Sequence, residues 1–222
     1  MGEKNHNLDS VKAHYAELAS RYDDKANPAC KRYYEALVTR VLAGRQRVLE
    51  LGAGSSSLLS CLDAPFKVAC DLSYAMLNAH APESGVHRLV ADGQVLPCTP
   101  NSLDAIYAIN VLEHTPDAQA VVDCAAELLQ PGGVFLALTP NGDAERLLDL
   151  LERLHLKLPE GPHQFRTFTD CAALAGDAFT TLEHKKCLAF PAGPPAWVNW
   201  IDGLSARPEG WGLFQYIVLE RR

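Results

Sequence analysis

Two closely spaced glycines follow an acidic residue in the segment 50–54, which reads Glu-Leu-Gly-Ala-Gly. Glycines at positions 52 and 54 let the backbone turn tightly and approach a ligand, because no Cβ atom intervenes. A helix predicted over 55–62 would add free N–H groups and the positive end of its dipole. The segment therefore predicts a ligand-binding loop between a strand and a helix.

Acidic residues near this loop indicate which ligand it takes. Glu50 lies two residues before the first glycine, where a carboxylate repels a diphosphate and suits a cation. Ser57 stands where the dinucleotide-binding pattern G-x-G-x-x-G needs its third glycine. Asp71 ends the next predicted strand, in a position to accept both hydroxyl groups of a ribose. The loop therefore favours a ribose-containing ligand with a positive charge and disfavours a nicotinamide dinucleotide.

Short apolar and β-branched segments alternate with helical patterns along most of the chain. Alternation of this kind predicts an α/β fold, an open parallel sheet with helices on both faces. The expected strands are 47–51, 67–71, 86–91, 103–110, 134–140, 180–190 and 213–220. The expected helices are 8–21, 28–43, 55–62, 73–79, 116–129, 143–156, 169–176 and 196–205.

Composition narrows the class of protein further. The 222 residues suit one large domain, with 48% hydrophobic and 21% charged residues. A net charge of −7 argues against a nucleic-acid partner, and no apolar run is long enough for a transmembrane segment. Seven scattered cysteines without a C-x-x-C pair favour a cytoplasmic location and indicate neither a metal site nor a disulfide framework.

Three further motifs follow the loop and the acidic strand end: Ala91-Asp92-Gly93, the segment 103–114, and Leu128–Gly133. In this order the five motifs resemble the class I S-adenosylmethionine-dependent methyltransferases, in particular the small-molecule group that includes the ubiquinone-biosynthesis O-methyltransferases. The resemblance covers about residues 15–141. It implies S-adenosyl-L-methionine as the cofactor, S-adenosyl-L-homocysteine as the product and a small-molecule methyl acceptor.

The resemblance also implies an architecture. It is a Rossmann-like, seven-stranded, mostly parallel sheet of order 3-2-1-4-5-7-6, with the last strand antiparallel. One methyltransferase domain would span residues 1–222. Its parts would be N-terminal lid helices at 1–44, a cofactor-binding core at 45–141 and an acceptor-side part at 142–222. The oligomeric state stays open.

Cofactor-binding roles follow from the same resemblance. Glu50 and the loop backbone would surround the methionine part, and Asp71 would hold the ribose. Asp92 would take the exocyclic amine of the adenine, and carbonyl groups around Asn110 would meet the cofactor's amino group. Tyr15 would belong to the N-terminal lid. The other implied cofactor contacts are Tyr22, Gly52, Ala53, Gly54, Leu72, Met76, Ala91 and Gly93. One departure is Ser56, which stands where the family usually has a glycine.

Acceptor-side roles are weaker inferences. His114 follows the fourth expected strand and His163 lies in a loop that covers the acceptor pocket in similar enzymes, so both are candidate general bases, with a structural role as the alternative for each. Arg166 is interpreted either as a contact to an acidic substrate or, preferably, as a surface salt bridge. Trp211 is expected either to line the acceptor pocket or, preferably, to belong to the core of the C-terminal segment. Asp104 is expected only to end a loop.

Two other classes of function stay open. One is a nicotinamide-dependent oxidoreductase, which Glu50 and Ser57 disfavour. The other is a methyltransferase-like module that keeps the fold for binding or partner activation without catalysis. Methylation of amide or nucleobase nitrogens is disfavoured, because residues 110–113 read Asn-Val-Leu-Glu and lack the Pro-Pro pair of that class. The oxygen, nitrogen or carbon atom of a small metabolite remains the expected acceptor.

Overall fold

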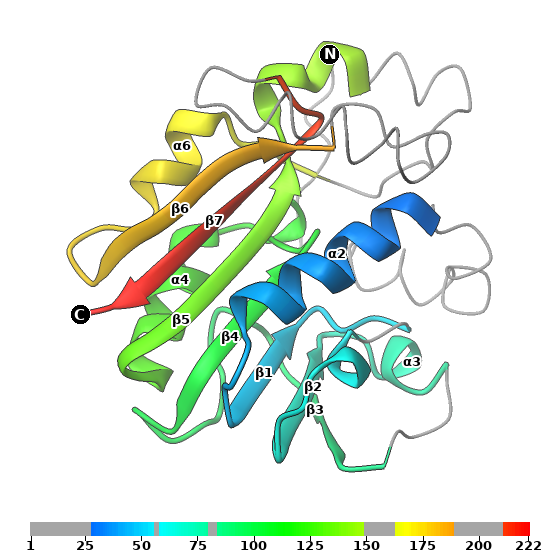
Figure 1. Cartoon of the computed structure of the whole chain (residues 1–222), viewed down its shortest axis with the longest axis vertical. Coiled ribbons are helices and arrows are strands. Elements are labelled where there is room, and N and C mark those ends of the chain that lie inside the picture. The colour runs from blue at the N-terminus through cyan, green and yellow to red at the C-terminus, as the bar shows by residue number, and fades with distance from the viewer. Residues whose placement is uncertain (1–27, 56–57, 80–83, 149–162, 189–210) are drawn as a thin grey trace.

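A computed structural model describes residues 28–55, 58–79, 84–148, 163–188 and 211–222 of the chain. Its strands form one seven-stranded sheet in the order β3-β2-β1-β4-β5-β7-β6 (Figure 1). Strands β1 to β5 run parallel, and β7 is antiparallel to both of its neighbours, β5 and β6. The order predicted through the family resemblance is confirmed.

The described elements keep the alternation seen in the sequence. The strands are β1 (Arg47–Leu51), β2 (Phe66–Asp71), β3 (Val86–Val90), β4 (Leu103–Ile109), β5 (Leu129–Pro140), β6 (Phe179–Cys187) and β7 (Phe214–Arg221). The α-helices are α2 (Pro28–Val41), α3 (Tyr74–Leu77), α4 (Ala118–Leu128) and α6 (Phe168–Ala173). Short 3-10 turns are η2 (Leu59–Cys61), η3 (Leu112–His114) and η4 (Gly142–Ala144). Within this part of the chain, no helix combines the length and the apolar character that a membrane crossing requires.

Two hydrophobic cores cover the two faces of the sheet. Helix α2 packs on one face and α4 with α6 lie on the other (Figure 1). Successive residues of a strand contribute to opposite cores, as the pleat requires: Ala105 and Tyr107 of β4 face the α2 side, and Ile106 and Ala108 face the α4 side. Because both faces are covered, every residue from Leu103 to Ala108 is buried.

Two expected elements differ in the structure. In place of a helix over 55–62, the described residues of that segment form only the three-residue turn η2. Strand β5 begins at Leu129 instead of residue 134, because Leu129 pairs with Leu103 before a register shift and the regular ladder follows from Val134. The predicted helices 8–21 and 196–205 lie outside the described residues.

Two further interpretations were wrong. Asp104 lies inside β4 and is buried, and its two carboxylate oxygens accept the backbone N–H groups of Gln46 (2.8 Å) and Arg47 (2.9 Å). It therefore satisfies two backbone donors at the start of β1. Trp211 is half exposed and does not belong to either core.

A charged cluster attaches α2 to the far edge of the sheet. The guanidinium of Arg40 donates to both carboxylate oxygens of Glu183 on β6, at 2.7 and 3.1 Å. The hydroxyl of Tyr216 on β7 donates to the same carboxylate at 2.9 Å. The hydrogen bonds from Arg40 are the main reason why the pKa of Glu183 falls to about 2. One helix and two strands distant in sequence are thereby joined.

Candidate functional site

The glycine loop follows β1 at the carboxyl edge of the parallel strands. Gly52 and Gly54 have φ angles of 64° and 59°, a region in which only glycine is unstrained. A Cβ atom on Gly52 would overlap the Cγ2 atom of Val111, which follows β4. The backbone N–H of Ala53 donates to the carbonyl of Cys70 at 3.0 Å and fixes the loop against β2. The loop therefore keeps this conformation only because Gly52 and Gly54 have no Cβ atom, and we call residues 52–54 the cradle.

Asp71 closes this cradle from the end of β2. One carboxylate oxygen accepts the N–H of Gly54 at 2.9 Å, and the other accepts the N–H of Ser73 at 2.8 Å. Burial raises the pKa of Asp71, and these two hydrogen bonds oppose that rise. Each oxygen keeps a second lone pair, so the carboxylate can accept two hydroxyl groups of a ribose.

Glu50 is buried on the inner side of the loop. One of its oxygens accepts the backbone N–H of Leu58 at 3.2 Å. The carboxylate therefore helps to position the chain that leaves the loop, in addition to placing negative charge beside it. That charge suits a ligand with a cationic centre.

Asn110 directly follows β4, the strand that pairs with β1 on the side away from β2. Its φ angle is 55°, and its backbone N–H donates to the carbonyl of Leu138 at 2.8 Å. The side-chain nitrogen donates to the hydroxyl oxygen of Tyr34 on α2 at 3.3 Å. Within the described residues, the side-chain oxygen Oδ1 is buried and accepts no hydrogen bond. An acceptor left without a donor is costly, and a ligand ammonium group would satisfy it.

The adenine side of the predicted site lies on α3 and after β3. Met76 is buried, and its Cε lies 3.4 Å from where a Cβ of Gly54 would be. Asp92 holds the backbone N–H of Gln94 at 2.9 Å, so its carboxylate is fixed. The N–H of Ala91 donates to the carbonyl of Asp71 at 3.1 Å, which joins the ends of β2 and β3. Leu72 and Gly93 are half-buried beside these residues.

Together these residues form a candidate site for the predicted cofactor. The described residues bring a cation-compatible cradle, a ribose acceptor and an unsatisfied oxygen to the carboxyl edge of the sheet. Ligands of open α/β sheets bind at this edge. Tyr15 and Tyr22 lie outside the described residues.

The two predicted histidines are brought to neighbouring segments. His114 lies in η3 and is 7% exposed. The backbone N–H of Gln164 donates to the carbonyl of Glu113 at 2.7 Å, which places the 163–167 segment against η3. His163 is half-buried and stacks on the ring of Phe165, with centroids 4.2 Å apart. The structure therefore gathers both histidines beside the end of β4.

Several residues of this region have no sequence signal. Tyr34 reaches Asn110 from α2, and its ring contacts Phe214 edge-on at a centroid distance of 6.4 Å. Glu113 is 1% exposed and accepts the hydroxyl of Thr139 at 3.0 Å. Gln215 on β7 is also 1% exposed and contacts the 163–167 segment. Their partners lie 26 to 76 positions away in the sequence, so no local pattern predicts these contacts, although Glu113 itself belongs to the 103–114 motif.

Comparison with known proteins agrees with this geometry. Residues 49–137 match a family model described as a methyltransferase domain. A ubiquinone biosynthesis O-methyltransferase of Xanthomonas euvesicatoria pv. vesicatoria is 30% identical over 179 residues, which are 72% of this chain and 74% of the relative. The chain belongs to the S-adenosylmethionine-dependent methyltransferase family. A second relative of the same name, from Xylella fastidiosa, is 35% identical over 147 residues, 61% of this chain. The chain matches about 60% of that relative's length.

A solved methyltransferase structure shares the fold. The N-methyltransferase NodS of Bradyrhizobium japonicum, in complex with S-adenosyl-L-homocysteine, has a TM-score of 0.68 and 13% sequence identity. The similarity covers 96% of this chain and 98% of NodS. S-adenosyl-L-methionine is the cofactor of the family to which the chain belongs, and the loop after β1 with Asp71 and Asn110 fits it. The cofactor supplies a methyl group on a positively charged sulfur, which is already electrophilic.

Proposed function

We propose that the protein transfers a methyl group from S-adenosyl-L-methionine to a hydroxyl oxygen of a small molecule. The observation that carries this proposal is the cradle after β1, with Asp71 held against Gly54 and with Gly52 packed on Val111. The choice of oxygen rests on relatives named O-methyltransferases with 30–35% identity. A small acceptor fits the acidic chain, because a nucleic acid would need a basic surface.

The chain's own residues have three tasks in this proposal. Glu50, Asp71, Asp92 and Asn110 bind and orient the cofactor. The 163–167 segment, which packs on η3, positions the acceptor and keeps water away from the reacting atoms. His163 is proposed as the general base that removes the hydroxyl proton, because it is half-buried and can meet an acceptor. His114, which is buried, is the second candidate for this proton.

Experiments can distinguish this proposed function from two alternatives. A nicotinamide-dependent oxidoreductase would need a diphosphate beside the buried Glu50, where negative charge opposes it. A non-catalytic binding module would keep the cofactor site and lack turnover. The cytoplasmic location predicted from the scattered cysteines stays a prediction.

Thermal unfolding with excess S-adenosylmethionine, S-adenosylhomocysteine or NADH tests the cofactor. A ligand at about 100 times its Kd stabilises a folded protein by about 2.7 kcal/mol. We expect a higher Tm with the two sulfur compounds and no change with NADH. A higher Tm with NADH alone would contradict the proposal.

Turnover is measured next, as S-adenosylhomocysteine formed with dihydroxybenzene acceptors. We expect the variant His163→Asn to lower kcat by about 100-fold, within the usual range of general-base catalysis, without a change in cofactor Kd. His87→Asn is a matched control, since His87 is exposed on β3. Cofactor binding without turnover on any phenol, amine or carbon acid would identify the non-catalytic module.

A further inference from the structure

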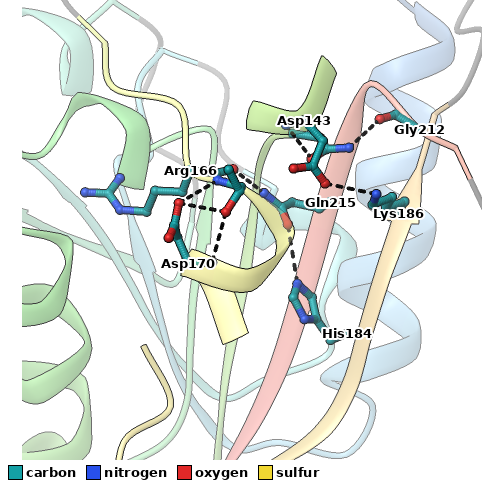
Figure 2. Close-up of polar contacts among 9 residues, drawn as sticks. Asp143, Arg166, Asp170, His184, Lys186, Gly212 and Gln215 are labelled. Carbon is teal, nitrogen blue, oxygen red and sulfur yellow. Dashed lines mark hydrogen bonds and ion pairs between the residues drawn. The ribbon is translucent and has the colours of Figure 1, made fainter. Parts of the chain in front are cut away.

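The backbone of Arg166 is held from two directions. Its carbonyl accepts the N–H of Gly142 at 2.8 Å and the side-chain nitrogen of Gln215 at 2.7 Å. Figure 2 shows the contact between Arg166 and Gln215 of β7, with His184 below it. A Cβ atom on Gly142 would lie 2.7 Å from the carbonyl carbon of Arg166, so the close approach requires glycine there. The side-chain oxygen of Gln215 lies 3.4 Å from Nε2 of His184.

The guanidinium of Arg166 is also anchored, but only through one nitrogen. Nη1 donates to the carbonyl of Leu112 in η3 at 2.7 Å and to the carbonyl of Gln164 at 3.5 Å. In Figure 2 the side chain extends away from Gln215 and from strands β6 and β7. Across the described part of the chain, Nε and Nη2 donate to no group and no carboxylate forms an ion pair with Arg166. The predicted surface salt bridge is therefore not formed among these residues.

The nearest acidic residue along the chain is already engaged. Asp170 accepts the backbone N–H of Thr167 at 3.0 Å and its hydroxyl at 2.7 Å, in the capping box of α6 (Figure 2). These bonds are the main cause of its lowered pKa, and the charge of Arg166 contributes least. The Nε–Nη2 edge of Arg166 is thus left for another carboxylate. An arginine binds a carboxylate with two parallel hydrogen bonds through such an edge.

We propose that Arg166 binds a carboxylate group of the methyl acceptor, so the substrate is an anionic small molecule. The inference rests on the proposed function, because it concerns the acceptor of that reaction. The location supports it, since Leu112 and Gln164, which anchor the guanidinium, adjoin Glu113, His114 and His163. The two hydrogen bonds to the carbonyl of Arg166, from Gly142 and Gln215, support it as well. They hold the residue in place before binding, and a side chain ordered in advance loses less entropy when a ligand binds.

The test uses the full chain saturated with S-adenosylhomocysteine. The probes are 3,4-dihydroxybenzoate and benzoate, each compared with its neutral benzyl alcohol, and Kd is measured by calorimetry. We expect the wild-type protein to bind each carboxylate at least about tenfold more tightly than the alcohol, in line with a charge-assisted hydrogen bond. Arg166→Met should reduce that preference to less than about twofold, with unchanged affinity for S-adenosylhomocysteine.

Further variants separate charge from position. Arg166→Lys keeps the charge without the planar fork and should retain only part of the preference. Gln215→Leu frees the carbonyl of Arg166 and should weaken carboxylate binding while the charge stays. Arg146→Met is a matched control, because Arg146 is an exposed cation after η4, and it should change nothing.

Three results would overturn the proposal: no carboxylate preference in the wild-type protein, an equal preference in Arg166→Met, or binding of none of the probes. Each of these results is obtained on protein that has bound S-adenosylhomocysteine. None of them would therefore contradict the proposed cofactor site. Failure to bind S-adenosylhomocysteine would instead contradict the proposed function. If Arg166→Met does not fold, Arg166→Lys and Gln215→Leu carry the comparison.

Discussion

The cofactor side and the acceptor side of the molecule are built in different ways. On the cofactor side, the glycine loop is held by a contact with a nearby segment, that of Gly54 with Asp71, 17 positions apart, although Asn110 reaches farther, to Tyr34 over 76 positions. On the acceptor side, Gln215 meets Arg166 over 49 positions, and Arg40 meets Glu183 over 143. A short motif can encode the first kind of contact and cannot encode the second.

The matched family model covers the expected cofactor side and only the start of the acceptor side. It covers residues 49–137, which include the glycine loop, Asp71, Asn110 and His114, and it ends before the 163–167 segment and β7. The part proposed to bind the cofactor is therefore the part that matches the family model. The part that should bind the acceptor, with the 163–167 segment and β7, lies beyond the matched residues.

The largest expected effect concerns Gly52. In Gly52→Ala the new Cβ would overlap Val111 and would hold a residue with φ of 64°. We expect the Kd of S-adenosylhomocysteine to rise by about 100-fold or more, equivalent to about 2.7 kcal/mol. Gly44→Ala is the matched control: its φ is 76° with no atom within 4 Å of the Cβ position, so it carries backbone strain without a clash. Equal calorimetric affinities in both variants would show that the cradle is not the binding loop.

A smaller effect is expected at Asp71. Asp71→Ala removes the carboxylate that accepts the N–H groups of Gly54 and Ser73 and that should accept the ribose. Hydrogen bonds to a charged group contribute about 1.5–3 kcal/mol each, so Kd should rise by about tenfold or more. The exposed Asp63→Ala is the control for charge. Unchanged calorimetric affinity in Asp71→Ala would mean that the ribose is held elsewhere.

The smallest effect is expected at Glu183. A change there should lower the stability of the fold without changing cofactor affinity. The folded-state pKa of Glu183, about 2, lies below its ordinary value of 4.5, so its stabilising contribution is present above pH 4.5 and is lost as the pH falls towards 2. The cluster is partly exposed, so Glu183→Gln should lower the free energy of unfolding at pH 7 by only about 0.5–1 kcal/mol.

Urea unfolding at pH 7 and pH 3 measures this difference, which should shrink at the lower pH. The exposed Glu127→Gln is a control for net charge. Cofactor affinity should not change in either variant. A loss of cofactor binding in Glu183→Gln would show that the two sides are not independent.

Sequence reasoning succeeded for features of structure that depend on local backbone conformation. The glycine loop and the alternation of strands and helices follow from φ angles and side-chain periodicity, which are local properties. It failed for Asp104, because a buried carboxylate that satisfies β1 cannot be told from a loop residue without knowing that β4 lies beside β1. It also missed Tyr34 and Gln215, because ordinary tyrosine and glutamine residues carry no pattern. The roles assigned to the individual site residues, from Glu50, Asp71, Asp92 and Asn110 on the cofactor side to His114 and His163 on the acceptor side, stay predictions.

The position of β7 has a consequence for how the chain acquires its structure during synthesis. Strand β7 lies between β5 and β6 but is made after both, and each of them hydrogen-bonds to it. Until residues 214–221 leave the ribosome, β6 has no neighbour in the sheet and Arg166 lacks its contact with Gln215. A nascent chain can therefore assemble its cofactor strands first, and it exposes two unpaired strand edges in the interval. The acceptor side is the last part to form and the part most open to misassembly.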